Sequence, residues 1–172
     1  MASFDDLSFV WDSTASGGGE TVTLSPGWRR ADPPAEPQPM SLEAFRAAVE
    51  EELDLLPPYC FDELSGGVLV EDRARLSPDS VADDLYILGL YRWNQLGKQV
   101  TLYYGSFVAV LGQAEERAYR DQIRETLRHE FRHHMETRAG EFGKGSLIEE
   151  DERRREAYFQ ARRGQVGRGR ER

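Results

Sequence analysis

Hydrophobic residues recur at helical spacing in three parts of the chain. The first part follows Ser41, which can cap a helix, and ends before Pro57, because the residue ahead of a proline resists the helical conformation. The second part covers about residues 114–139, and the third begins at Ser146 after a glycine-rich turn. This spacing predicts three helices, two of which follow one another near the C-terminal end.

Three runs between the first and second helix are rich in β-branched and aromatic residues and predict strands. They cover residues 68–71, residues 85–93 and the segment from Val100 to Tyr104. The polar segment 72–84 is predicted to be a loop, and a short helix is expected over residues 106–111. The elements therefore predict a domain that contains both helices and strands.

The two ends of the chain differ in composition from the part between them. Residues 1–40 contain three consecutive glycines, several serines and a proline-rich run, and residues 161–172 are rich in glycine and arginine. Such compositions bury too little apolar surface to hold one conformation. We expect a disordered N-terminal tail or linker over 1–40, one domain over 41–160 and a disordered basic tail over 161–172. Two apolar pieces of the first tail, 9–11 and 22–24, could pair with the domain.

The net charge and the cysteine content of the 172-residue chain exclude some classes of function. A net charge of -9 disfavours nucleic acid as the main partner, because phosphate binding needs a concentrated basic surface. A single cysteine excludes an internal disulfide framework and fits a reducing compartment. No apolar run approaches the ~20 residues that cross a bilayer, and the N-terminal residues are acidic where a signal peptide would be basic. We therefore expect a cytoplasmic protein without a membrane partner.

The candidate chemistry lies in the sequence His129-Glu130-Phe131-Arg132-His133. A helix advances ~100° per residue, so the two histidines lie one turn apart on nearly the same face, where both imidazoles can reach one ion. Glu130 lies beside them, where its carboxylate could take a proton from a metal-bound water. The pattern predicts two zinc ligands and one general base.

A solvated, charged helix is the simpler alternative, because a pattern with three fixed positions also occurs by chance. The helical phase favours the metal site. With Tyr119 of the apolar stripe at zero, His129 and His133 fall at ~280° and ~320°, at the margin of the buried face. His134 falls at ~60°, inside the stripe, which predicts a hydrogen-bonded core histidine instead of a ligand.

Three carboxylates are candidates for the third ligand. Asp151 falls within the apolar arc of the last helix, where a carboxylate is costly unless a cation or hydrogen bonds receive it. Its simpler role is an ion pair with Arg155 one turn later. Glu136, three residues after His133, could bind metal or orient a ligand imidazole. Glu152 lies at the edge of the apolar arc.

Four short motifs follow one another along the chain: Leu56-Pro57-Pro58-Tyr59, Leu88-Gly89-Leu90-Tyr91, Val100-Thr101-Leu102-Tyr103-Tyr104-Gly105 and His129-Glu130-x-x-His133-His134. In this order they resemble the small zincin-like metallopeptidases of bacteria, also called minimal zincins. The resemblance covers about residues 41–160 and implies an α+β fold in which a small mixed sheet packs on a long active-site helix. It also implies an edge strand that can pair with an extended peptide, which we expect at the segment from Val100 to Tyr104.

In this family a short turn with glycine and then Asp-Glu-Arg follow the second histidine, and the Asp is the expected third ligand. Here residues 135–146 intervene before Asp151-Glu152-Arg153, so the resemblance assigns Asp151 at a longer spacing.

These observations predict a zinc metallopeptidase. His129, His133 and Asp151 would hold Zn²⁺, and Glu130 would pass a proton from the attacking water to the leaving amine. Tyr158, near Asp151, is a candidate to stabilise the oxyanion. The partner would be a peptide or protein substrate. The alternative is a metal-stabilised protein-binding module without peptidase turnover, which does not require Glu130.

Overall fold

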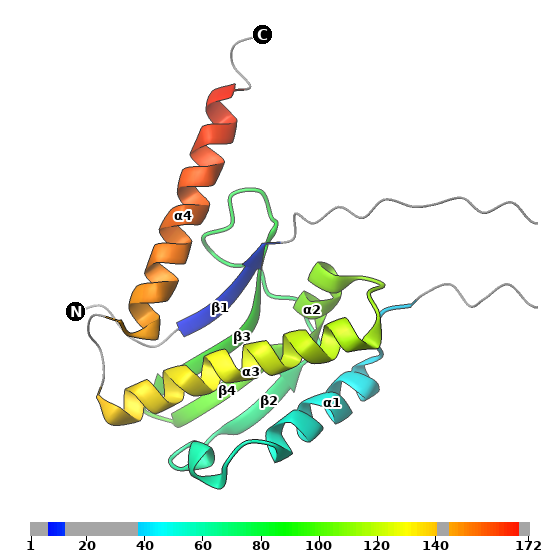
Figure 1. Ribbon diagram of the computed structural model, residues 1–172, viewed down its shortest axis with the longest axis vertical. Coiled ribbons are helices and arrows are strands. Elements are labelled where there is room, and N and C mark those ends of the chain that lie inside the picture. Colours follow the sequence, from blue (N-terminus) through cyan, green and yellow to red (C-terminus); the bar gives the residue numbers. More distant parts are fainter. Residues whose placement is uncertain (1–6, 13–37, 141–144, 169–172) are drawn as a thin grey trace, which may run out of the picture.

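A computed structural model of the chain describes residues 7–12, 38–140 and 145–168 (Figure 1). It contains helices and strands in mixed order, which confirms the predicted α+β class. The elements are β1 (Leu7–Asp12), α1 (Leu42–Asp54), the short 3-10 helix η1 (Pro58–Phe61), β2 (Gly67–Glu71), β3 (Leu85–Asn94), β4 (Gly97–Tyr103), α2 (Tyr104–Leu111), α3 (Glu116–Ala139) and α4 (Leu147–Arg168).

The strands form one mixed sheet in the order β1-β3-β4-β2. β3 pairs antiparallel with both β1 and β4, whereas β2 runs parallel to β4. β4 is therefore paired on both sides, and the prediction of a free edge at the segment from Val100 to Tyr104 was wrong. The physical reason is the long connection over residues 72–84, which lets β2 skip its neighbour in sequence and close the side of β4 that we expected to be open.

The long helix α3 crosses one face of this sheet, and α1 lies beside it (Figure 1). The apolar stripe of α3 is buried as its spacing predicted, with Tyr119 and Ile123 fully inaccessible to solvent. Ser41 caps α1 by accepting a hydrogen bond from the Ala44 amide at 3.2 Å. The small mixed sheet therefore packs on the helix that carries the histidine motif, as the resemblance implied.

Both predicted tails contain regular structure. Residues 7–12 form β1 and pair with β3, so the expectation of disorder was wrong for this segment, while pairing of the piece 9–11 is confirmed. The other apolar piece, 22–24, lies outside the described residues. At the other end α4 continues to Arg168, so residues 161–168 are helical. Within the described ranges, the helices are all too short or too polar to cross a membrane.

Candidate metal centre

The histidine motif occupies the buried side of α3, close to its C-terminal end. His129 is 8% exposed, Glu130 0% and His133 1%, although this part of the helix also carries exposed arginines. The helix stops at Gly140, whose φ of 70° lies in the left-handed region that favours glycine. The chain can therefore reverse there and bring the following helix back toward the histidines.

The start of α4 is fixed by contacts with α3. Ser146 is buried and its hydroxyl accepts a hydrogen bond from the Glu149 amide at 3.4 Å. Glu136 accepts a hydrogen bond from the Leu147 amide at 2.8 Å and pairs with Arg132 at 2.9 Å. Glu136, the main rival for the third ligand position, therefore holds the first turn of α4.

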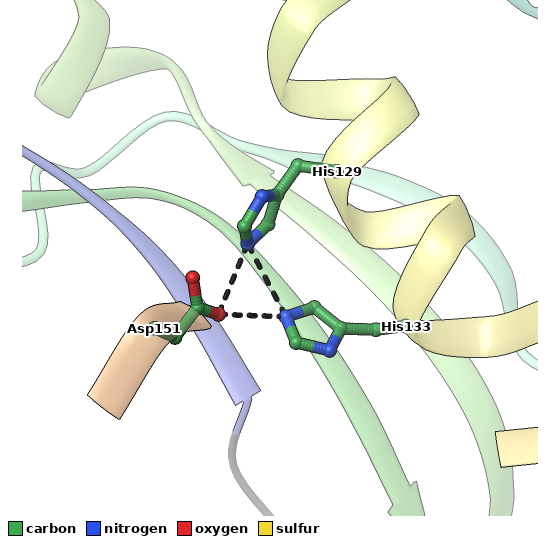
Figure 2. Close-up of side chains that lie close together, drawn as sticks. All are labelled: His129, His133 and Asp151. Carbon is green, nitrogen blue, oxygen red and sulfur yellow. Dashed lines mark hydrogen bonds and ion pairs between the residues drawn. The ribbon is translucent and has the colours of Figure 1, made fainter. Parts of the chain in front are cut away.

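Asp151 lies one turn into α4 and faces both histidines (Figure 2). Its Oδ2 is 3.2 Å from Nε2 of His129 and 2.9 Å from Nε2 of His133, and the two nitrogens are 3.2 Å apart. Within the described part of the chain, this is the one group of three His, Cys, Asp or Glu residues able to hold a metal ion. Glu152, the other rival, is exposed.

These distances fit the donor spacing of a zinc site. A tetrahedral zinc with bonds of ~2.05 Å holds neighbouring ligand atoms ~3.3 Å apart. The three observed separations are 2.9–3.2 Å, close to that spacing without rearrangement of the helices. Two imidazole nitrogens and one carboxylate oxygen are also a donor set that zinc accepts.

The surroundings of Asp151 and His133 favour the protonation states in which these two residues bind metal. Burial opposes ionisation of Asp151, but hydrogen bonds with His129 and His133 and their charges together lower the pKa of this carboxyl to about 2. Burial is also the main reason that the pKa of His133 is lowered, which favours the neutral imidazole. Asp151 is therefore an anion at neutral pH, and His133 is neutral, as ligands must be.

Glu130 packs against the backbone of β3 at Gly89. A Cβ at position 89 would lie 2.9 Å from both Cγ and Oε1 of Glu130 and 2.6 Å from Cγ2 of Thr126. Real side-chain atoms do not approach so closely, so this position has room for glycine alone. A glycine inside a strand signals such a close approach, and this signal was present in the sequence.

His134 has the structural role that its helical phase predicted. It is fully buried, and its Nε2 donates to the Asp62 carbonyl at 2.9 Å, because a carbonyl can only accept. Nδ1 is then the acceptor for the Tyr91 hydroxyl at 3.2 Å. His134 thus ties α3 to β3 and to the turn after η1, and both of its ring nitrogens are taken by these two partners.

The body of α4 is held by the loop between β2 and β3. Tyr158 donates to Oδ1 of Asp84 at 3.0 Å and accepts from the Val81 amide at 3.1 Å. Arg155 pairs with Asp79 at 3.1 Å, and Arg162 pairs with Asp84. These contacts correct one expectation, because Arg155 pairs with Asp79 instead of Asp151. The Tyr158 hydroxyl, two turns after Asp151, is engaged by Asp84 and Val81, and its role toward an oxyanion stays a prediction.

Sequence reasoning missed this loop as part of the site. Residues 72–84 look like an ordinary polar connection, and nothing in their spacing relates them to a helix more than 60 residues later. Aspartates alternating with serines and a proline are typical of any surface turn. Only the folded chain shows that Asp79 and Asp84 hold the helix that carries Asp151.

Comparisons with known proteins agree with this description. The family profile described as zincin-like metallopeptidase matches residues 67–142, which include the histidine motif but end before Asp151. A solved structure of a conserved hypothetical protein from Thermo thermophilus is 32% identical in sequence. The match covers 58% of this chain and 98% of that chain, with a TM-score of 0.50. None of the curated proteins matches this chain.

Proposed function

This chain belongs to the zincin-like metallopeptidase family, and from that premise we propose that it is a zinc-dependent peptidase. His129, His133 and Asp151 would hold the metal, and Glu130 would act as general base. The observation that supports this most strongly is the meeting of three ligand atoms, 2.9–3.2 Å apart. One of these atoms belongs to His129, and the fully buried Glu130 is the next residue on α3.

The ligand set favours a catalytic site over a structural one. Structural zinc sites use four protein ligands, whereas catalytic sites use three and keep one position open. The described residues supply three ligands here. When bound, zinc polarises a substrate carbonyl and lowers the pKa of a water molecule to about 7. This supports the peptidase over the alternative, a binding module that uses metal for stability alone.

The role of Glu130 follows from its place next to His129 on α3. Its carboxylate would accept a proton from the water that attacks the peptide carbonyl, and it would return this proton to the amine as the C–N bond breaks. The residue is fully buried against β3, which keeps bulk water from competing for that proton. Such proton transfer typically contributes about 10²–10⁴-fold to a rate.

The test compares Glu130→Gln with Glu125→Gln, a matched control on the exposed side of the same helix. Both variants and the wild type are measured for zinc content and for cleavage of a random-sequence peptide mixture, read by mass spectrometry. We expect about one zinc per chain in all three proteins, and a loss of cleavage of about 100-fold or more in Glu130→Gln alone.

Two outcomes would overturn the proposal. Equal cleavage by the wild type and Glu130→Gln would remove Glu130 as the base. A zinc-loaded wild type that cleaves no peptide, and that unfolds at lower temperature when zinc is removed, would instead support the metal-stabilised binding module.

A further inference from the structure

Strand β1 lies on the edge of the sheet that is closest to the metal centre. It pairs antiparallel with β3, and α3 contacts β1 as well as β3. In Figure 1 it lies between β3 and the first turns of α4, and in Figure 2 it passes next to the group formed by His129, His133 and Asp151. Residues 7–12 of the chain itself therefore lie along the site.

The register of β1 brings its backbone to the level of Glu130. Phe9 pairs with Gly89, the residue that packs against the Glu130 carboxylate, and the next pair is Val10 with Ile87. The register shifts between these two pairs, so the ladder is irregular at the point closest to the proposed base. A regular ladder on both sides of this point covers the edge of β3 from Leu85 to Tyr91.

β3 pairs with β4 on one side and with β1 on the other. Removal of β1 would therefore leave one edge of β3 unpaired. An unpaired strand edge binds extended peptides through main-chain hydrogen bonds, with little dependence on the peptide's sequence. A peptidase needs its substrate extended, with one carbonyl near the metal and the base. The edge of β3 supplies this alignment directly beside Glu130, whereas β2, at the opposite edge, is separated from β3 by β4.

The family resemblance already implies a sheet edge that pairs with an extended peptide, and the β3 edge, residues 85–91, lies beside the proposed base. We propose that residues 7–12 of this chain occupy and block that edge, so that an extended peptide binds only by displacing them. This inference rests on the proposed peptidase function and names the segment of the chain that controls access to its site. The ligand is a proline-free extended peptide of about six residues, the length that β1 pairs. It runs antiparallel to β3, as β1 does.

The binding test uses the full-length chain carrying Glu130→Gln, so that a bound peptide is not cleaved. Ser8→Pro together with Phe9→Pro breaks the β1 ladder, because adjacent backbone amides of a strand point to opposite sides and one of the two must face β3. Thr14→Pro with Ala15→Pro is the matched control beyond β1. The probe is a dye-labelled peptide with the sequence Leu-Ser-Phe-Val-Trp-Asp, and its binding is measured by fluorescence anisotropy.

We expect the β1 proline variant to bind the probe at least about tenfold more tightly than the control variant, because the competing strand has been lost. Hydrogen exchange should show faster exchange of amides in residues 85–91 of the β1 variant, and renewed protection when the probe is added. Equal affinity in the two variants would overturn the proposal, as would tighter binding that leaves exchange in 85–91 unchanged.

These outcomes are separate from a failure of the proposed function. Binding and exchange are measured without catalysis, so they report on the β3 edge even if Glu130 proves not to be the base. In the otherwise wild-type protein, the β1 proline variant should also lower KM for peptide cleavage with little change in kcat. A change in kcat alone would contradict displacement of β1 by substrate.

Discussion

Gly89 of β3 and Glu130 of α3 are in direct contact, and this contact is possible because glycine has no Cβ atom. A Cβ at position 89 would lie 2.9 Å from Cγ and Oε1 of Glu130. The strand therefore sets the depth at which the carboxylate lies relative to the ligands on the same helix.

The first prediction concerns the substitution Gly89→Ala. The added methyl group collides with Thr126 and Glu130, so we expect a loss of ~1–3 kcal/mol in the free energy of unfolding and a fall in peptidase activity of about tenfold or more. Chemical denaturation and cleavage assays measure the two effects. Adding Thr126→Ala removes the closest clash and should restore part of the stability but little of the activity. Full activity in Gly89→Ala would show that Glu130 can work from another position.

The second prediction concerns the third ligand. Asp151→Asn keeps the size of the side chain but removes the negative charge, so zinc affinity should fall by about tenfold or more. Glu152→Gln is the matched control, because Glu152 is the next residue and is exposed. Competition with a chromophoric chelator measures both affinities. A greater loss in Glu136→Gln than in Asp151→Asn would assign the ligand to Glu136 and contradict the geometry.

The third prediction concerns the loop that holds α4. Tyr158→Phe removes the hydrogen bonds to Asp84 and Val81, so α4 should be held less firmly and Asp151 should be less well placed for metal. We expect zinc affinity to fall by about 3–10-fold, which corresponds to about 1 kcal/mol and is part of the ~1–3 kcal/mol that two net hydrogen bonds contribute. Tyr59→Phe, at an exposed tyrosine, is the control. Equal zinc affinity in the two variants would mean that the loop does not position Asp151.

The fourth prediction is a loss of stability in mild acid that depends on His134. Burial lowers the pKa of His134 below its ordinary value of 6.5, so the unfolded chain takes up the proton first as the pH falls. The free energy of unfolding should therefore decrease below about pH 6.5. His133, whose pKa is also lowered by burial, acts in the same direction, whereas Asp151, with a pKa of about 2, matters only in stronger acid.

Thermal unfolding of the zinc-free protein between pH 7.5 and 5 tests this prediction. Gln at position 134 keeps a donor and an acceptor but cannot titrate, so His134→Gln should show a smaller decrease across this range than the wild type. The same slope in both proteins would mean that His134 takes up its proton equally well when folded.

The sequence alone determined the elements and most of the candidate chemistry, because these depend on local spacing. Helical periodicity located α1 and α3 to within a few residues. Ser41 correctly indicated the start of α1, because it is the N-cap residue of that helix. The four-residue interval between His129 and His133 placed both imidazoles on one face before any tertiary contact was considered. The same phase argument separated His134 from them and predicted its buried hydrogen bonds.

The tertiary structure alone decided what depends on contacts between distant segments. Asp151, Glu136 and Glu152 were all possible third ligands by helical phase, and only the reversal at Gly140 and the packing of α4 brought Asp151 Oδ2 to both imidazoles. The sequence led to a wrong prediction of which strand forms the edge of the sheet. Strand order depends on which strands pair in the folded protein and not on their order in the chain. The strand β1 also depends on a distant contact. Its six residues are too few to form stable structure by themselves, and they become a strand by pairing with β3.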